Sequence, residues 1–326
     1  MTSANLQDII EPIRDDLRSF DRKLESYLSA ESALITSVIK HIMASKGKRL
    51  RPAILFLTAR SGDYMSDQVI DAALSIELIH TATLLHDDVI DESDLRRGQE
   101  TVNYRWNNLV SVLMGDFLFS RAFRIMVGTG STELVASISA ATERVSFGEL
   151  RQVEEVANYE LPEDEYIKII SDKTASLFAT ACEAGPILHK ASPADRKLLY
   201  SFGENIGIAF QIADDLLDFI GDTRRTGKEV GSDLIQGKVT LPLIYSLSKS
   251  SPKSQQEITG LLGNGIDKEG IDRVLKFVTE QGGIEYAYNR AQEFSDRAGE
   301  TCNNLKDSVY NSTLREILRF AVARDN

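Results

Sequence analysis

The sequence predicts an all-α fold, a helical bundle formed as a single domain over residues 1–326. Apolar residues recur at three- and four-residue spacing through almost the whole chain, which is the periodicity of amphipathic helices. Only 7 of the 326 residues are proline, and no stretch alternates apolar and polar residues as paired strands do. No linker or low-complexity tract interrupts this pattern, so one domain is favoured.

The apolar periodicity gives the order of the helices. Before the first polar, glycine-containing loop, helices are predicted over 5–28, 32–45, 51–63 and 67–92. The next set covers 105–127, 131–156, 163–184 and 194–220, and after a second polar loop come 239–249, 253–262, 268–281, 284–301 and 304–323. Much of 67–92 and the end of 194–220 are apolar on nearly every face, so these two helices belong at the centre of the bundle.

An acidic motif, DDxxD, stands at the C-terminal end of each central helix. Residues four apart share one helix face, so Asp87 and Asp91 point in one direction, as do Asp214 and Asp218. These like charges repel, and the negative end of the helix dipole adds to them, so a bound cation is expected. Carboxylates with no His or Cys cluster favour Mg²⁺ over zinc. The candidate metal ligands are Asp87, Asp88, Asp91, Asp214, Asp215 and Asp218.

Composition narrows the function classes. The net charge of −12 argues against a nucleic-acid partner, which needs a basic face. Cys182 and Cys302 form no CxxC pair, so neither a disulfide framework nor a zinc site is expected, and both are interpreted as buried apolar residues. The first residues lack the pattern of a signal or transit peptide, and no uninterrupted apolar run reaches membrane-spanning length. A cytoplasmic protein without a stable membrane anchor is expected.

Basic residues accompany both acidic motifs. Carboxylates beside guanidinium and ammonium groups fit a polyphosphate ligand, because Mg²⁺ bridges acid to phosphate while Arg binds the remaining oxygens. Together they would stabilise the charge that grows on a departing diphosphate. The candidates are Lys48, Arg49, Arg51, Arg96, Arg97, Lys173, Lys228 and Lys238.

A set of motifs resembles a known enzyme family. GKRLRP, LLHDDVID…RRG, GELRQ, DKTASLF and FQIADDLLD…GK…GSDL…GKVTLP, in this order over about residues 35–245, resemble the trans-type prenyltransferases. These (E)-isoprenyl diphosphate synthases extend an allylic diphosphate, here farnesyl or geranylgeranyl diphosphate, with isopentenyl diphosphate. The resemblance implies an isoprenoid-synthase-like bundle around a central hydrophobic cavity, Mg²⁺ as cofactor and a homodimer. It also implies ionisation to an allylic cation, attack by the isopentenyl double bond, and proton loss to the departing diphosphate.

The resemblance assigns roles to individual positions. Asp87, Asp91 and Asp214 would hold Mg²⁺, supported by Asp88, Asp215 and Asp218. The allylic diphosphate would contact Arg96, Lys173, Lys228 and Lys238, with Thr174 and Gln211 near the reacting carbons. The diphosphate of isopentenyl diphosphate would be held by Lys48, Arg51, His80 and Arg97.

Product length follows from two small residues on the first central helix. In short-chain members of the family, a bulky aromatic residue about one turn before the first aspartate blocks the growing chain. Ala82 and Thr83 occupy these positions here, and Thr83 shares a face with Asp87, so the tunnel is expected to be open. A long prenyl product of the octaprenyl or solanesyl class, suited to the side chain of a quinone, is predicted, and Ala82→Phe is expected to shorten this product.

Other interpretations remain. The alternatives for the whole chain are a geranylgeranyl diphosphate synthase, a non-catalytic regulatory subunit of a heteromeric synthase, a terpene cyclase, and a metal-buffering helical protein. Both acidic motifs and the lysines argue against the regulatory subunit, and GKRLRP argues against the cyclase. Among single residues, His86 is interpreted as a packing histidine. Glu149 and Gln152 either line the bundle or support the metal ligands.

Overall fold

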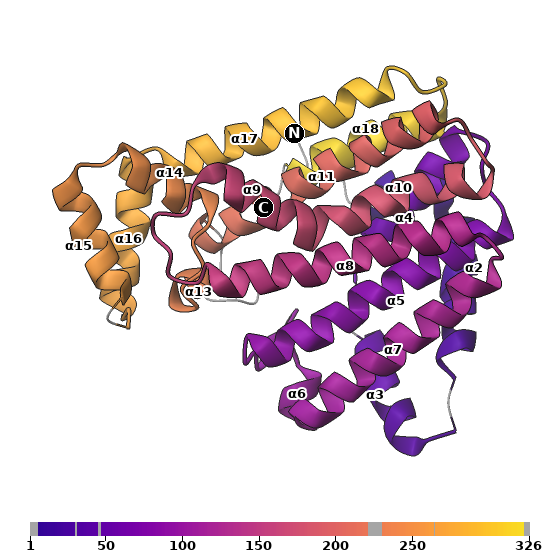
Figure 1. Cartoon of the computed structure of the whole chain (residues 1–326), viewed down its shortest axis with the longest axis horizontal. Helices are drawn as coiled ribbons and strands as arrows, with labels where there is room; N and C mark the ends of the chain where they lie inside the picture. The colour runs from indigo at the N-terminus through magenta and orange to yellow at the C-terminus, as the bar shows by residue number, and fades with distance from the viewer. Residues whose placement is uncertain (1–5, 30, 45–46, 221–229, 264, 323–326) are drawn as a thin grey trace. The chain divides into compact units, whose positions relative to one another are not determined.

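A computed structural model of the chain (Figure 1) describes residues 6–29, 31–44, 47–220, 230–263 and 265–322. Most of the described residues are helical, and the strands among them form one short hairpin, which confirms the all-α prediction. Contacts between Cα atoms divide the chain into two compact units. Unit 1 comprises residues 1–142, 177–203 and 300–317, and unit 2 comprises residues 143–176, 204–299 and 318–326. The single domain stays a prediction.

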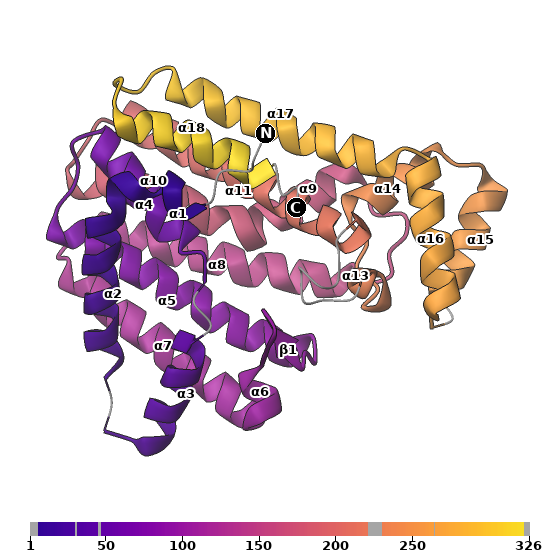
Figure 2. The same cartoon turned by 180° about the vertical axis from the view of Figure 1, so that it is seen from behind.

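The first part of unit 1 runs in chain order through short and long helices and one hairpin (Figures 1 and 2). Its elements are α1 (Leu6–Ile9), the 3₁₀ turn η1 (Glu11–Ile13), α2 (Arg14–Leu28), α3 (Ala33–Ala44), α4 (Leu50–Ser61), α5 (Asp67–Ile90), β1 (Leu95–Arg96), β2 (Gln99–Glu100), α6 (Val102–Arg105) and α7 (Asn108–Gly128).

The later elements belong to unit 2 or contribute residues to both units. They are α8 (Thr132–Glu154), α9 (Glu163–Ile170), the π-helical turn η2 (Ser171–Ala175), α10 (Ser176–Leu188), α11 (Pro193–Ile220), α13 (Ser232–Ile235), α14 (Leu241–Lys249), α15 (Pro252–Gly263), α16 (Lys268–Glu280), α17 (Gly283–Cys302) and α18 (Val309–Val322). The division between units falls within α8, α10, α11, α17 and α18.

Helix α5 forms the centre of unit 1, as its uniform apolarity predicts. Small residues on α7 allow the two helices to approach closely: Ser111 Oγ donates to the carbonyl of Leu85 at 2.9 Å, and Gly115 lies directly against His86. His86 is therefore a packing residue, as interpreted from the sequence. By length and composition α5 could cross a membrane, but 61% of its apolar window is buried inside the protein. Burial of that extent is typical of a core helix.

Unit 2 has its own apolar core. Helices α9, α11, α14, α16 and α17 contribute buried side chains to one continuous cluster, which includes Tyr166, Ile212, Leu241, Val278 and Ala291. Each of these helices places apolar residues three or four positions apart toward the cluster, so the core follows from the periodicity. This core supports the end of α11 and the turn η2, where the second acidic motif and Lys173 lie.

Three sequence predictions of element boundaries are wrong in detail. The helix predicted over 5–28 is interrupted by η1, which contains Pro12, because proline lacks the amide that an uninterrupted helix requires. The helix predicted over 163–184 contains the π-helical turn η2 and extends to Leu188. The loop after the first motif contains β1, β2 and α6, which are too short to produce a periodic pattern.

Candidate active site

The first acidic motif lies at the C-terminal end of helix α5 in unit 1. The backbone NH of Asp91, the C-cap, donates to the carbonyl of Asp87 at 2.8 Å, so these two partly exposed residues lie one helical turn apart. Asp88 is buried, and its Oδ1 accepts a hydrogen bond from Arg96 Nε at 2.6 Å. The motif thus presents two carboxylates at the surface and uses the third in a shielded ion pair.

A tight hairpin carries both arginines of the RRG segment. Arg96 pairs with Gln99 across the hairpin. The turn residues Arg97 and Gly98 have φ angles of 53° and 75°, as in a type I′ turn, in which both central residues are left-handed. The glycine is therefore required by the local backbone conformation, and the turn places Arg96 and Arg97 side by side at the tip of the hairpin.

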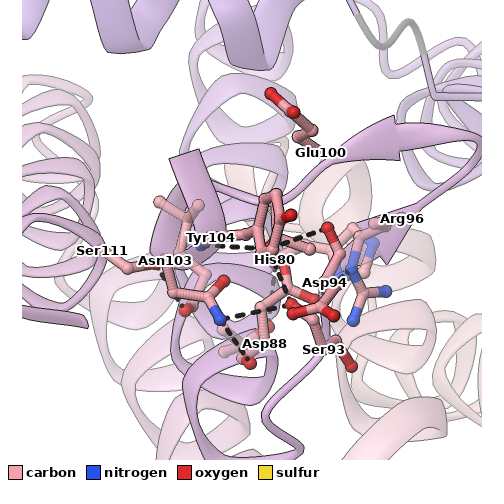
Figure 3. A network of polar contacts seen from close by, with 12 residues as sticks. His80, Asp88, Ser93, Asp94, Arg96, Glu100, Asn103, Tyr104 and Ser111 are labelled. Carbon is pink, nitrogen blue, oxygen red and sulfur yellow. Dashed lines mark hydrogen bonds and ion pairs between the residues drawn. The ribbon is translucent and has the colours of Figure 1, made fainter. Parts of the chain in front are cut away.

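Polar contacts hold the hairpin region against the end of α5 (Figure 3). Asn103 Nδ2 donates to the carbonyls of Asp88 and Ser93, each at 3.2 Å. Thr101 Oγ1 also donates to the carbonyl of Ser93, at 2.7 Å. Asn103 and Arg96 lie on opposite sides of Asp88 in this view. The side chain and the main chain of Asp88 are both engaged, so the last turn of α5 has a fixed position relative to the hairpin.

His80 lies on α5 among four arginines of unit 1. Burial, and then the positive charges of Arg51, Arg97, Arg96 and Arg49, lower the pKa of His80 well below its ordinary value of 6.5. The imidazole is therefore neutral at pH 7 and can donate a hydrogen bond without adding charge. The structure thus gathers three of the four residues predicted to hold isopentenyl diphosphate, and concentrated guanidinium groups suit such an anion.

An aromatic ring and a carboxylate position Arg51. Its guanidinium carbon lies 4.4 Å from the centroid of the Phe178 ring. Burial, partly offset by the charge of Glu77, lowers the pKa of Arg51 to about 10, so it remains a cation at pH 7. Glu77 also accepts a hydrogen bond from Arg49 Nη1 at 2.8 Å. Lys48, the fourth residue predicted to hold isopentenyl diphosphate, is exposed and directly precedes Arg49 in the chain.

A pocket of about 100 Å³ opens beside these groups. His80, Asp88, Arg96 and Arg97 form part of its polar lining, and helices α2, α3 and α5 supply apolar side chains. A Cβ at Gly47 would lie 2.7 Å from Arg97 Nη1, so glycine at the start of GKRLRP leaves room for that guanidinium. The pocket therefore combines cationic and apolar walls, as a diphosphate with a hydrocarbon tail requires.

The second acidic motif lies at the end of α11 in unit 2. Asp215 is buried and accepts hydrogen bonds from Tyr166 Oη at 2.6 Å and from Gln211 Nε2 at 2.7 Å. Burial, with the charges of Asp233 and Asp214, raises the pKa of Asp215 to about 8, although the two hydrogen bonds act in the opposite direction and lower it. Asp214 is exposed, so its carboxylate faces solvent.

The allylic-site candidates of unit 2 form one connected set. Thr174 Oγ1 donates to Gln211 Oε1 at 2.7 Å, and the same glutamine donates to Asp215. Lys173 Nζ contacts the carboxylate of Glu149 and donates to Gln152 Oε1 at 3.3 Å. Glu149 and Gln152, which the sequence left as lining or supporting residues, therefore orient Lys173.

Asp218 organises the loop that leads to Lys238. Its Oδ1 accepts hydrogen bonds from the backbone NH of Ser232 at 3.0 Å and from Ser232 Oγ at 2.8 Å. Its Oδ2 accepts from the backbone NH of Asp233 at 3.0 Å. The third aspartate of the motif thus caps α13, and Lys238 follows within the same segment. Lys228, a predicted diphosphate contact, lies outside the described residues.

The donor set suits a hard divalent cation. All the predicted ligands are carboxylates, and burial together with the neighbouring charges of Asp233 and Asp214 raises the pKa of Asp215. A nearby cation would favour the charged form of such a carboxylate. Within the part of the chain that the structure describes, no three acidic, imidazole or thiol side chains gather into a preformed cluster. Proteins commonly hold Mg²⁺ through one or two carboxylates together with phosphate oxygens of the ligand.

The chain-length candidates differ in accessibility. Ala82 is fully buried, whereas Thr83 is partly exposed and donates from Oγ1 to the carbonyl of His80 at 2.8 Å. A larger side chain can therefore be accommodated more readily at Thr83 than at Ala82.

The sequence matches the family model of polyprenyl synthetase over residues 32–278. The chain belongs to the polyprenyl synthetase family. Octaprenyl diphosphate synthase of Escherichia coli (strain K12) is 37% identical over 321 residues, which cover 98% of this chain and 99% of that protein. The all-trans-nonaprenyl-diphosphate synthase (geranyl-diphosphate specific) of Rhodobacter capsulatus is 37% identical over 319 residues, 98% of each chain.

A solved structure confirms the fold. The polyprenyl synthase of Caulobacter crescentus CB15, complexed with calcium and isoprenyl diphosphate, superposes with a TM-score of 0.93 at 33% identity, and the match covers 99% of each chain. The isoprenoid-synthase-like, all-α fold and the family that the motifs predicted are therefore both confirmed.

Proposed function

We propose that this protein is a magnesium-dependent trans-polyprenyl diphosphate synthase that extends farnesyl or geranylgeranyl diphosphate with isopentenyl diphosphate to a long-chain product. The observation that carries the proposal is the 37% identity, over nearly the full length, to octaprenyl and nonaprenyl diphosphate synthases. The chemistry of the described side chains is consistent with it, because each unit contains an acidic motif with cationic groups nearby.

The proposed roles of single residues come from the family resemblance, and the local geometry is consistent with them. Arg51, neutral His80 and Arg97, with Lys48, would bind the diphosphate of isopentenyl diphosphate. Arg96 donates from Nε to Asp88, and the remaining donors of its guanidinium suit the allylic diphosphate. Lys173 and Lys238 would bind the same diphosphate through their ammonium groups. Magnesium ions, one held by Asp87 and Asp91 of unit 1 and another by Asp214 of unit 2, would supply positive charge to the departing diphosphate.

The residues around Thr174 would act on the reacting carbons of the allylic substrate. Thr174 and Gln211 are already hydrogen-bonded to each other, and Gln211 is held in turn by Asp215. Such preorganised dipoles stabilise a developing cation without reorganising during the reaction. The chain needs no side-chain nucleophile for this mechanism.

The decisive experiment incubates purified protein with isopentenyl diphosphate, an allylic primer and Mg²⁺, and sizes the products by mass spectrometry. A ladder that ends at a long polyprenyl diphosphate is the expected result. Termination at geranylgeranyl diphosphate would favour the alternative, a geranylgeranyl diphosphate synthase. No product from farnesyl or geranylgeranyl diphosphate would contradict the proposal and favour a regulatory subunit.

Thr83→Phe is expected to shorten the product by at least one isoprene unit, because the larger ring occupies the partly exposed position one turn before Asp87. Ala82→Phe is expected to shorten it too, but at a cost of about 1–3 kcal/mol for overpacking a fully buried position. Product length is read by mass spectrometry and stability by thermal unfolding. Thr83→Ser is the matched control, and unchanged product length in both Phe variants would refute the open tunnel.

A homodimer is proposed because helix α7 of unit 1 presents an apolar stripe. Leu109, Leu113, Phe123 and Val127 recur on one helix face and are each more than two-fifths exposed. Exposed apolar surface of this kind marks an interface, and a second copy of the chain is the partner that the family resemblance implies.

Leu113→Asp combined with Val127→Asp is expected to convert the dimer largely to monomer, because it places two charges in the proposed interface. Sedimentation velocity at micromolar concentration measures the mass. Val309→Asp, which changes an exposed valine on α18 of the same unit, should leave the mass unchanged. A monomeric wild-type protein at this concentration would contradict the proposal that α7 forms a dimer interface.

A cytoplasmic location without a stable membrane anchor is also proposed. Its support is the net charge of −12 and the burial of most of the apolar window of α5 inside the protein. Cell fractionation that recovers the full-length chain in the membrane pellet after a salt wash would contradict it.

A further inference from the structure

The π-helical turn η2 carries two residues of the proposed allylic site. Residues 163–188 form a continuous helical segment in which Ser171–Ala175 has π geometry, and the backbone NH of Ser176 donates to the carbonyl of Ser171. Insertions of this kind are rare, locally unfavourable and frequent at functional sites. Lys173 and Thr174 both lie in this turn, so their direction depends on what holds it.

Arg144 of α8 binds the start of the turn through its side chain. Its Nε donates to Asp172 Oδ1 at 2.7 Å, and its Nη2 donates to Ser171 Oγ at 2.9 Å and to Glu204 Oε1 of α11 at 3.1 Å. Ser171 Oγ also donates to Glu204 Oε1 at 3.1 Å. One guanidinium therefore joins α8, η2 and α11, and its planar fork suits several acceptors at fixed angles.

The same helix meets the other side of the turn. Four and five residues after Arg144, Gly148 lies against the backbone of Lys173, and Glu149 pairs with its ammonium group. Gln152 Oε1 accepts a hydrogen bond from the same ammonium group. Helix α8 thus touches η2 at one end through Arg144 and at the other through the partners of Lys173. Rotation of the turn about its axis would break one set of contacts or the other.

We propose that Arg144 is a positioning residue, which sets the direction of Lys173 and Thr174 by fixing the π-helical turn between α8 and α11. This inference rests on the proposed function of the site. Arg144 acts through the turn and need not touch the substrate, and all the contacts that carry the inference lie within unit 2.

The test compares Arg144→Met with the matched variant Arg196→Met. Arg196 also joins α11 to α8, through Glu133 at 3.3 Å, and its side chain is 29% exposed, as is that of Arg144. Arg196 and Glu133 belong to unit 1, whereas η2 belongs to unit 2. Arg144→Met is expected to lower kcat about 10- to 100-fold, the scale of a small misplacement of a reacting group. It should raise KM for the allylic diphosphate more than KM for isopentenyl diphosphate. Arg196→Met should change neither.

Coupling to Lys173 separates positioning from general destabilisation. If Arg144 acts through Lys173, Arg144→Met should cost little further activity in a Lys173→Met background. Arg144→Lys should restore only part of the activity, because an ammonium group lacks the planar fork. An equal loss in both backgrounds, equal changes in both KM values, or unchanged kinetics would overturn the inference.

Hydrogen exchange tests the same contact without turnover. Amides of residues 168–178 should exchange faster in Arg144→Met than in wild-type protein or Arg196→Met, and equal exchange would overturn the inference. If the wild-type protein forms no prenyl diphosphate, the proposed function fails, whereas the exchange measurement still decides whether Arg144 holds the turn.

Discussion

Replacing Asp214 with Ala is expected to lower the rate of diphosphate release about 10²- to 10³-fold, the usual cost of removing one group that stabilises transition-state charge. Asp214 is exposed at the end of α11, beside the buried Asp215, whose pKa the charge of Asp214 helps to raise. In the proposed function it is the accessible magnesium ligand of the second motif. Its removal weakens metal binding and, through the metal, the stabilisation of the departing diphosphate.

The measurement is a coupled diphosphate assay over a series of Mg²⁺ concentrations. In Asp214→Ala, both the maximal rate and the affinity for Mg²⁺ should fall. Asp272→Ala is the matched control, because Asp272 is an exposed aspartate on α16 of the same unit. An Asp214→Ala protein with the wild-type rate and Mg²⁺ dependence would exclude this residue from the metal site.

The sequence predicts the long elements of this fold well because their signals are local. An apolar residue every three or four positions requires a buried helix face, and α5 and α11 are apolar enough to be recognised as central. The placement of the acidic motifs at helix ends follows directly from that pattern. The shared face of Asp87 and Asp91 depends only on helical geometry, so it too is predictable.

The sequence does not predict the contacts that orient the site, because their partners are distant in the chain. Tyr166, which donates to Asp215, is 49 residues away from it, and Arg144 is 28 residues from Asp172. No spacing rule connects such positions. The π-helical turn has no periodic signal either, because one additional residue shifts the pattern by less than the tolerance of a helix prediction.

Gly148→Ala is expected to lower activity about 10²-fold and to destabilise the protein by about 1–3 kcal/mol, because the new methyl group meets main chain. A Cβ at Gly148 would lie 2.5 Å from the backbone nitrogen of Lys173 and 2.9 Å from its Cα. Backbone atoms cannot rotate away as a side chain can, so α8 or the turn η2 must move. Either movement displaces the ammonium group of Lys173 from Glu149. Steady-state kinetics and thermal unfolding measure the two effects.

Replacing Gly260 with Ala is expected to change stability in the opposite direction. The comparison therefore identifies the contact between Gly148 and the backbone of Lys173 as the cause of the loss. Gly260 lies within α15 of unit 2, and a Cβ there meets nothing within 4 Å. Alanine in a helix interior is favoured over glycine by about 0.5–1 kcal/mol, so Gly260→Ala should raise stability and leave activity unchanged. Both glycines are helical, so propensity alone predicts stabilisation at both. Stabilisation by Gly148→Ala with full activity would show that the turn tolerates displacement and that the direction of Lys173 is not set there.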